Sequence, residues 1–149
     1  MVMKNIRKLE CSDVPFYNMV RNECCEFLHD PITYTLPEAY KWHFNNNNPF
    51  FIYEIDNEMV GYFRTSNWKP NSCYIGMDIH KDYRGKGLAY DAYKLFFKYL
   101  NDKFNILRFY LEVLESNTRA LNLYKKLGFK QMNSYITKHN VNSLIMRLE

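Results

Sequence analysis

The segment Arg84-Gly85-Lys86-Gly87-Leu88-Ala89 holds two of the five glycines in this 149-residue chain. Before it, Cys73 to Ile79 is an apolar, β-rich run, and after it Leu88 to Leu100 repeats apolar residues at helical spacing. Glycines between a strand and a helix let the backbone approach a ligand and direct several N–H groups to one point. Because a helix N-terminus also favours negative charge, the segment predicts a phosphate or pyrophosphate site.

The spacing of the glycines separates this loop from two other phosphate-binding loops. A P-loop needs G-x-x-x-x-G-K-S/T, and the dinucleotide-binding loop needs G-x-G-x-x-G, whose third glycine is Tyr90 here. A P-loop nucleotidase or a Rossmann dehydrogenase is therefore not expected. Arg84, Lys86 and Lys81 are expected to supply positive charge around the anion.

Strand-like and helix-like patterns alternate along the rest of the chain. Strands are expected at 4–9, 50–55, 59–64, 73–79, 106–113, 129–138 and 143–148. Helices are expected at about 12–28, 35–44, 88–100 and 117–127. The unit at 73–113 is βαβ, so its two strands should be parallel with a right-handed crossover. The fold class is therefore α+β, with a mixed sheet.

Composition limits the classes of function. Hydrophobic residues make up 47% and charged residues 24%, as in a folded globular domain, so residues 1–149 are expected to form a single domain. A net charge of +4 suits an anionic ligand but does not argue for a nucleic-acid partner. No apolar run reaches the roughly 18 residues of a membrane span, and the N-terminus lacks a signal-peptide pattern, so a cytoplasmic protein is expected.

Cysteine and histidine positions argue against a metal site and a covalent mechanism. The four cysteines show no C-x-x-C spacing and are expected to be reduced thiols; they are Cys11, Cys24, Cys25 and Cys73. None has a basic neighbour in the sequence that would activate it as a nucleophile. The four histidines are too scattered for metal-ligand spacing, and no metal is expected.

A second motif follows the glycine loop by about thirty residues. It comprises Asn117, Ala120 and Leu123-Tyr124-x-Lys126-x-Gly128-Phe129. Together with Arg84-x-x-Gly87-x-Ala89, it resembles the GNAT superfamily of acyl-CoA-dependent N-acyltransferases over residues 50–149. Ala89 stands where many members have glycine. The resemblance implies a mixed sheet of about seven strands flanked by four helices, with a splayed parallel strand pair that holds the cofactor.

The resemblance also implies where acetyl-CoA binds. Its pyrophosphate is expected on the loop formed by Arg84, Gly85, Lys86, Gly87, Leu88 and Ala89. Its pantetheine amides are expected on the strand residues Met77, Asp78 and Ile79, and Asn117 matches the asparagine that hydrogen-bonds the cofactor. Gly76 in the same strand indicates a bulge or a close approach.

The catalytic residues are also assigned by resemblance. Tyr124 matches the general acid of the family. Glu112, within Leu-Glu-Val, matches the base of the branch that acetylates protein N-termini. Because other branches place the base elsewhere, Asp78 and His80 remain alternatives. No activated nucleophile is visible, so the amine is expected to attack the thioester directly in a ternary complex.

The acceptor stays open at this stage. A protein N-terminus or lysine, an amino sugar, a polyamine and an aminoglycoside are all candidates, and Val20-Arg21-Asn22 with Trp42 is similar to members that acetylate nucleotide-linked amino sugars. The alternative to an enzyme is a non-catalytic acyl-CoA-binding sensor or interaction module. An exposed edge strand near 143–148 could pair two copies into a homodimer. No nucleic-acid or membrane partner is expected.

Overall fold

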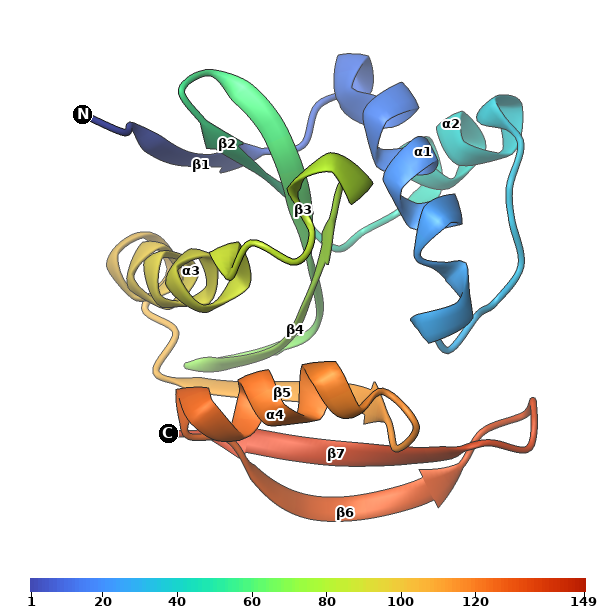
Figure 1. The fold of residues 1–149 in the computed structure, drawn as a ribbon, viewed down its shortest axis with the longest axis vertical. Helices are drawn as coiled ribbons and strands as arrows, with labels where there is room; N and C mark the ends of the chain where they lie inside the picture. The colour runs from blue at the N-terminus through green and yellow to red at the C-terminus, as the bar shows by residue number, and fades with distance from the viewer.

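One seven-stranded sheet runs through the computed structural model, which describes residues 1–149 (Figure 1). The strand order is β1-β2-β3-β4-β5-β7-β6, and every neighbouring pair is antiparallel except β4–β5. The strands are β1 (Lys4–Lys8), β2 (Phe51–Ile55), β3 (Glu58–Lys69), β4 (Ser72–Ile79), β5 (Arg108–Leu114), β6 (Lys130–Ile136) and β7 (Asn142–Leu148). The predicted mixed sheet with one parallel pair is confirmed.

Four α-helices cover this sheet, as predicted. They are α1 (Val14–Glu23), α2 (Leu36–Asn45), α3 (Leu88–Phe104) and α4 (Thr118–Leu127). α2 begins with the expected capping box, in which Thr35 and Glu38 each accept a backbone N–H from the other. No helix combines enough length with enough apolar character to span a lipid bilayer.

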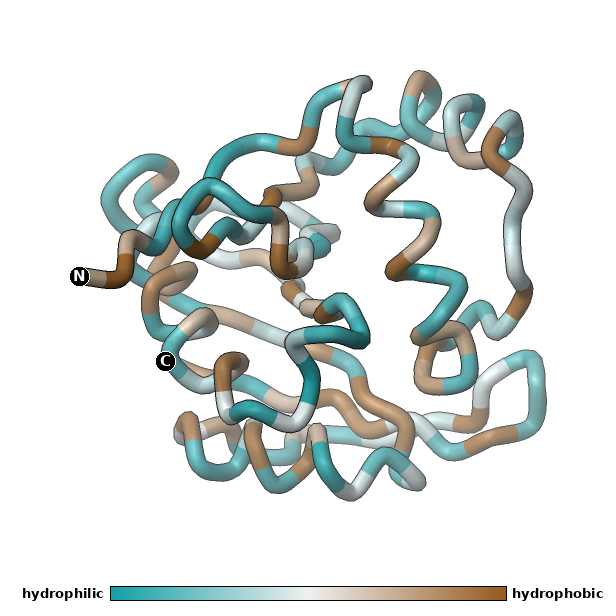
Figure 2. Tube along the Cα trace, turned by 45° about the horizontal axis from the view of Figure 1, so that its top comes forward, coloured by the Kyte–Doolittle hydropathy of each residue, from teal (hydrophilic) through white to brown (hydrophobic).

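Both faces of the sheet bury apolar side chains. Phe51, Tyr53 and Phe63 belong to the core that includes α3 and α4 residues, whereas Ile52 and Tyr62 belong to the core beneath α1 and α2. Neighbouring residues enter opposite cores because successive side chains of a strand point to opposite faces. Figure 2 shows hydrophobic and hydrophilic residues interspersed along the helices and strands.

α1 ends at Glu23, so the prediction that it continues to about Leu28 is wrong. The N–H of Cys24 is shared between the carbonyl oxygens of Val20 and Arg21, which tightens the chain into a 3-10 turn over Cys25–Phe27. Leu28 is then extended and buried. The residues after it form a loop that reaches towards β7.

The strand at the sheet edge also differs from the prediction. β7 lies between β5 and β6, so the expected edge at residues 143–148 is wrong. Its two sides are paired because β5 pairs with one edge of β7 over Phe109–Leu114, on the side of β5 opposite to β4, and β6 pairs with the other edge. The strands at the two edges are β1 and β6.

The stacked pair Phe63 and Phe96 gives a stability test of this packing. Their ring centroids are 3.9 Å apart, and both side chains are fully buried between β3 and α3. We expect Phe96→Ala to lower the free energy of unfolding by about 3–5 kcal/mol, because it leaves a cavity. Phe44→Ala, at a side chain that is 71% exposed, should change it by less than about 0.5 kcal/mol. Urea denaturation followed by circular dichroism measures both, and equal losses would contradict the packing described.

Candidate active site

A cleft of about 630 Å³ opens where the parallel strands β4 and β5 separate. The two strands pair only over Ser72–Tyr74 and Arg108–Tyr110, although β4 continues to Ile79 and β5 to Leu114. Beyond this short ladder, the facing N–H and C=O groups have no strand partner. Such groups need another hydrogen-bonding partner, and an extended ligand with amide groups can supply one.

The glycine loop forms one end of the cleft. Gly85 and Gly87 have φ of 74° and 71°, in the left-handed region that glycine adopts without strain. Gly87 is the N-cap of α3, and no side chain caps this end of the helix. A Cβ added at Gly87 would meet no atom within 4 Å, so the space in front of the first turn is open. The free N–H groups and the helix dipole make this space suitable for an anion.

The predicted basic side chains near this loop contact other groups of the protein. Arg84 turns back, donating from Nε to the Ile79 carbonyl at 2.8 Å and placing Nη2 3.6 Å from Glu23 Oε2. Lys81 also lies near Glu23, at 4.0 Å. Lys86 places its ammonium 5.9 Å from the Tyr83 ring centroid and does not line the cleft.

Two residues of α4 add positive charge to the cleft. The guanidinium of Arg119 lies 3.5 Å from where a Cβ of Gly85 would stand, and Lys126 also lines the cleft. Sequence reasoning missed Arg119. Its signal was its position in the second motif, two residues after Asn117 and within the first turn of a helix.

The cleft unites most of the residues predicted from the sequence. Those that line it are Met77, Asp78, Ile79, Arg84, Gly85, Gly87, Leu88, Ala89, Glu112, Asn117 and Tyr124. Asn117 caps α4 by accepting the Ala120 N–H at 3.3 Å, and its amide NH₂ group has no partner in the protein. His80 lies outside the cleft lining, and its Nδ1 accepts the Asp82 N–H at 3.0 Å.

Tyr124 contributes a phenol to the lining of the cleft. Its hydroxyl lies 3.2 Å from that of Tyr93, and both side chains are buried. Burial raises the pKa of Tyr124, and the opposing effects of the Tyr93 hydrogen bond and the Arg64 charge are smaller. The hydroxyl is therefore protonated at neutral pH and can donate a proton.

An ion pair lies across the splayed end of β4. Arg64 of β3 places Nε 3.5 Å from Asp78 Oδ2, and Tyr62 also donates a hydrogen bond to that oxygen. The guanidinium passes so close to Gly76 that an added Cβ would be 2.6 Å from Nη2. The predicted close approach at Gly76 is thus confirmed, and the approaching group is a side chain of the protein itself. Asp78 is buried with its charge compensated.

The other end of the cleft contains Glu112 and a histidine that sequence reasoning did not select. Glu112 Oε2 accepts a hydrogen bond from the Tyr135 hydroxyl at 3.1 Å and lies 4.0 Å from His29 Nε2. The same ring nitrogen is hydrogen-bonded to Ser143 Oγ. Burial lowers the pKa of His29, against the smaller effect of Glu112.

Cys24 also lines the cleft, and it has the basic neighbour that the sequence did not predict. Arg84 Nη2 donates to its sulfur at 3.0 Å, although the residues are far apart in the chain. Burial outweighs this charge and raises the pKa of Cys24 to about 11. The thiol is therefore protonated at neutral pH and is a poor nucleophile.

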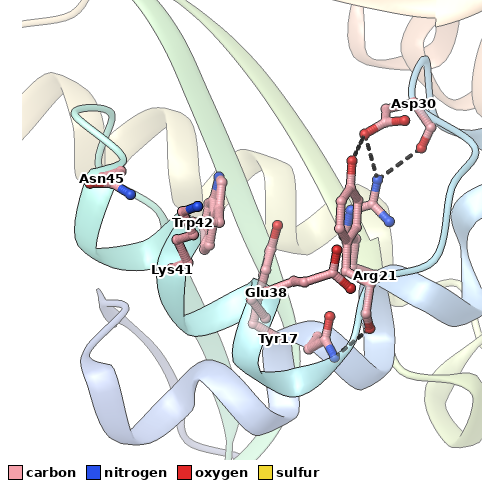
Figure 3. Close-up of a pocket in the computed structure, with 10 residues that line it drawn as sticks. Tyr17, Arg21, Asp30, Glu38, Lys41, Trp42 and Asn45 are labelled. Carbon is pink, nitrogen blue, oxygen red and sulfur yellow. Dashed lines mark hydrogen bonds and ion pairs between the residues drawn. The ribbon is translucent and has the colours of Figure 1, made fainter.

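A second cavity, of about 490 Å³, lies between α1 and α2 (Figure 3). Trp42 lines this cavity and stacks on Tyr17 with ring centroids 4.3 Å apart. Arg21 crosses it to Asp30, donating from Nη2 to the backbone oxygen at 2.8 Å. Arg21 is thus bound to the chain's own loop, and neither it nor Trp42 lines the cleft.

The matches to known proteins agree with this geometry. The family model "Acetyltransferase (GNAT) family" matches residues 16–129. An N-alpha-acetyltransferase of Sulfurisphaera tokodaii is 32% identical over 115 residues, which are 65% of this chain and 69% of that protein. A spermidine N(1)-acetyltransferase of Escherichia coli is 35% identical over 81 residues, 53% of this chain and 44% of that protein.

Solved structures share the whole fold. Spermidine N-acetyltransferase from Vibrio cholerae, in complex with CoA and spermine, superposes with a TM-score of 0.81 over 97% of this chain and 94% of that one, at 21% identity. Ribosomal-protein-alanine N-acetyltransferase from Brucella melitensis gives 0.79 over 97% and 98%, at 16% identity. With the family match over most of its length, this chain belongs to the GNAT acetyltransferase family and is an acetyl-CoA-dependent N-acetyltransferase.

Proposed function

We propose that the enzyme acetylates the α-amine of a peptide or protein N-terminus, by direct attack of the amine in a ternary complex. The observation that carries this proposal is the balance of charge at the acceptor end of the cleft. Among the residues that line the cleft, Glu112 and Asp78 are the carboxylates, and Asp78 is already paired with Arg64. One free carboxylate suits an acceptor with a single ammonium group. A polyamine carries several ammonium groups and would need more carboxylates.

The residues of the cleft fit acetyl-CoA as the co-substrate. The loop of Arg84, Gly85, Lys86, Gly87, Leu88 and Ala89 would hold the pyrophosphate on the open N-terminus of α3, with Arg119 beside it. Met77, Asp78 and Ile79 would present the unpaired edge of β4 to the pantetheine amides. Asn117 would add its free amide group. When bound, acetyl-CoA supplies the activated acetyl thioester.

Tyr124 and Glu112 would divide the proton chemistry. The Tyr124 hydroxyl, kept protonated by burial, would deliver a proton to the departing sulfur. Glu112 would attract the acceptor ammonium to the opposite end of the cleft and assist its deprotonation. Asp78 is less suited to that role, because Arg64 and Tyr62 already hold its charge. Since Cys24 is a protonated thiol, no acetyl-enzyme is part of the proposal.

The acceptor is tested by mass spectrometry of peptides incubated with enzyme and acetyl-CoA. Each peptide is compared with an N-terminally blocked copy that retains an internal lysine, and with spermidine and glucosamine. We expect acetylation of the free α-amine, with kcat/KM at least tenfold above that for spermidine. Faster acetylation of spermidine would contradict the peptide acceptor and indicate a polyamine instead. The similarity to spermidine acetyltransferases is the reason for this comparison. Binding of acetyl-CoA without acetylation of any amine would favour the sensor or interaction module.

Gly87→Glu tests the cofactor site. A carboxylate in the open space before α3 should repel the pyrophosphate, so we expect this variant to lose the thermal stabilisation by acetyl-CoA. At a concentration of 100 Kd, the wild type should gain about 2.7 kcal/mol, a rise in Tm of about 5–10 °C. Differential scanning fluorimetry measures this rise in Tm. Lys103→Glu makes a larger charge change at the other end of α3 and should keep the full rise; a rise preserved in Gly87→Glu would place the pyrophosphate elsewhere.

Tyr124→Phe tests the general acid. Loss of the hydroxyl should lower kcat by about 10²–10⁴-fold, because the proton donor is removed, while the KM for acetyl-CoA changes little. Steady-state kinetics gives both constants. The variant also loses the hydrogen bond to the Tyr93 hydroxyl, so circular dichroism is used to check that it still folds. Tyr99→Phe makes the same change in a residue outside the cleft and should leave kcat unaltered. A Tyr124→Phe variant with wild-type kcat would show that another group protonates the sulfur.

A further inference from the structure

We propose that His29 takes the proton of the acceptor ammonium and that Glu112 stabilises the imidazolium formed. The inference rests on one part of the proposed function, namely that the amine enters at the Glu112 end of the cleft. It does not depend on which amine is the acceptor. It assigns the base to a residue of the loop after α1, which no sequence motif marked.

His29 lies where four distant segments of the chain meet. The loop after α1 supplies His29, and β5, β6 and β7 supply Glu112, Tyr135 and Ser143. The hydrogen bond from His29 Nε2 to Ser143 joins residues 114 positions apart, and Glu112 lies 4.0 Å from the same nitrogen. The rings of His29 and Tyr135 stack with centroids 6.4 Å apart. These contacts fix the imidazole beside Glu112, and both residues line the cleft.

The two ring nitrogens of His29 have different surroundings. Nε2 is hydrogen-bonded to Ser143, whereas Nδ1 has no hydrogen-bond partner in the protein. If Nε2 bears the hydrogen and donates it to Ser143, Nδ1 presents its lone pair as a base. In the proposed step, one N–H bond of the ammonium breaks, its electron pair stays on the amine, and the proton bonds to Nδ1. The side chain is 28% exposed, so the imidazolium can return this proton to water.

An imidazole matches this task better than a carboxylate alone. An α-amine has a pKa near 8 and a free glutamate near 4.3, whereas a free histidine has one near 6.5, so the imidazole accepts the proton at a smaller energetic cost. Burial keeps His29 neutral at pH 7. The charged and titratable groups that face it are Glu112, Tyr135 and the more distant Arg64, and Glu112 is the one that favours the imidazolium.

Side chains of α1 hold the loop that carries His29. Figure 3 shows Arg21 reaching Asp30, the residue directly after His29, and its Nη1 also donates to the Ile32 carbonyl. Asn22 makes two hydrogen bonds with the backbone of Tyr34, one to its oxygen and one from its N–H. The backbone is thus fixed on the C-terminal side of His29. Arg21 and Asn22 are positioning residues for the imidazole.

His29→Ala with added imidazole is the test, using the amine that the wild type acetylates fastest. We expect kcat to fall about 100-fold with an unchanged KM for acetyl-CoA, because a general base contributes roughly 10²–10⁴-fold. Free imidazole should raise the kcat of His29→Ala at least tenfold. His139→Ala changes an exposed histidine in the turn between β6 and β7, and should show neither effect. The acetyl-CoA-induced rise in Tm verifies that His29→Ala folds, and His29→Gln gives a second variant that keeps a polar side chain.

The pH profile separates His29 from Glu112. In the wild type, kcat/KM should fall as pH decreases through the lowered pKa of His29, below 6.5. Glu112→Gln removes the charge that raises this pKa, so the acid limb should move to lower pH while persisting. Both His29 variants should lose the limb. A folded His29→Ala with wild-type kcat, or without rescue by imidazole, would overturn the role of His29. Such a result would leave the acceptor assignment intact, since the peptide and spermidine comparison decides that separately.

Discussion

The divergence of β4 and β5 after Tyr74 is the constraint on which the site depends. A parallel ladder normally satisfies the backbone of both strands, but here it ends after three pairs of residues. Arg64 extends across β4 at Gly76 to reach the buried carboxylate of Asp78, so an ion pair lies beyond the point where the strands separate. Removing one member of such a pair is costly, because the remaining charge is left uncompensated. The gap between β4 and β5 is therefore a stable feature of the folded structure.

The polarity of the cleft follows from which elements meet at its two ends. The first turns of α3 and α4 converge at the glycine loop and bring unpaired N–H groups together with Arg119. The other end is formed by β5 and by the loop after α1, which contribute Glu112 and a neutral His29. In the proposed function, an anionic co-substrate and a cationic acceptor would thus find complementary charge at opposite ends, and the buried Tyr124 lies among the lining residues.

Local patterns predicted the elements and the glycine loop, because strand period, helix period and a Gly-x-Gly turn are encoded within a few neighbouring residues. The sequence did not show how side chains turn in space. Arg84 stands in the motif yet binds Ile79 and Glu23, while the guanidinium beside Gly85 comes from Arg119. The edge strand was predicted wrongly for a similar reason, since strand order is decided by pairings between distant segments.

His29 illustrates the same limit at the active site. It was one of four scattered histidines, and Glu112, its neighbour in the cleft, lies on β5, more than eighty positions away. His80, which adjoins the cofactor strand in sequence, turns instead to the Asp82 N–H. The early end of α1 was also unpredicted, and the loop that follows it is the segment that brings His29 to Ser143. Proximity along the chain was therefore a poor guide to proximity in the cleft.

Burial favours the neutral form of three different groups in the cleft. Because desolvation disfavours the charged form, it raises the pKa of Cys24 and Tyr124 and lowers that of His29. All three are therefore neutral at pH 7, but the chemical consequence differs. A neutral thiol is inert, a neutral phenol is a proton donor, and a neutral imidazole is a proton acceptor. In the proposed mechanism, a single environment would thus suppress a covalent pathway while keeping both an acid and a base available for direct transfer.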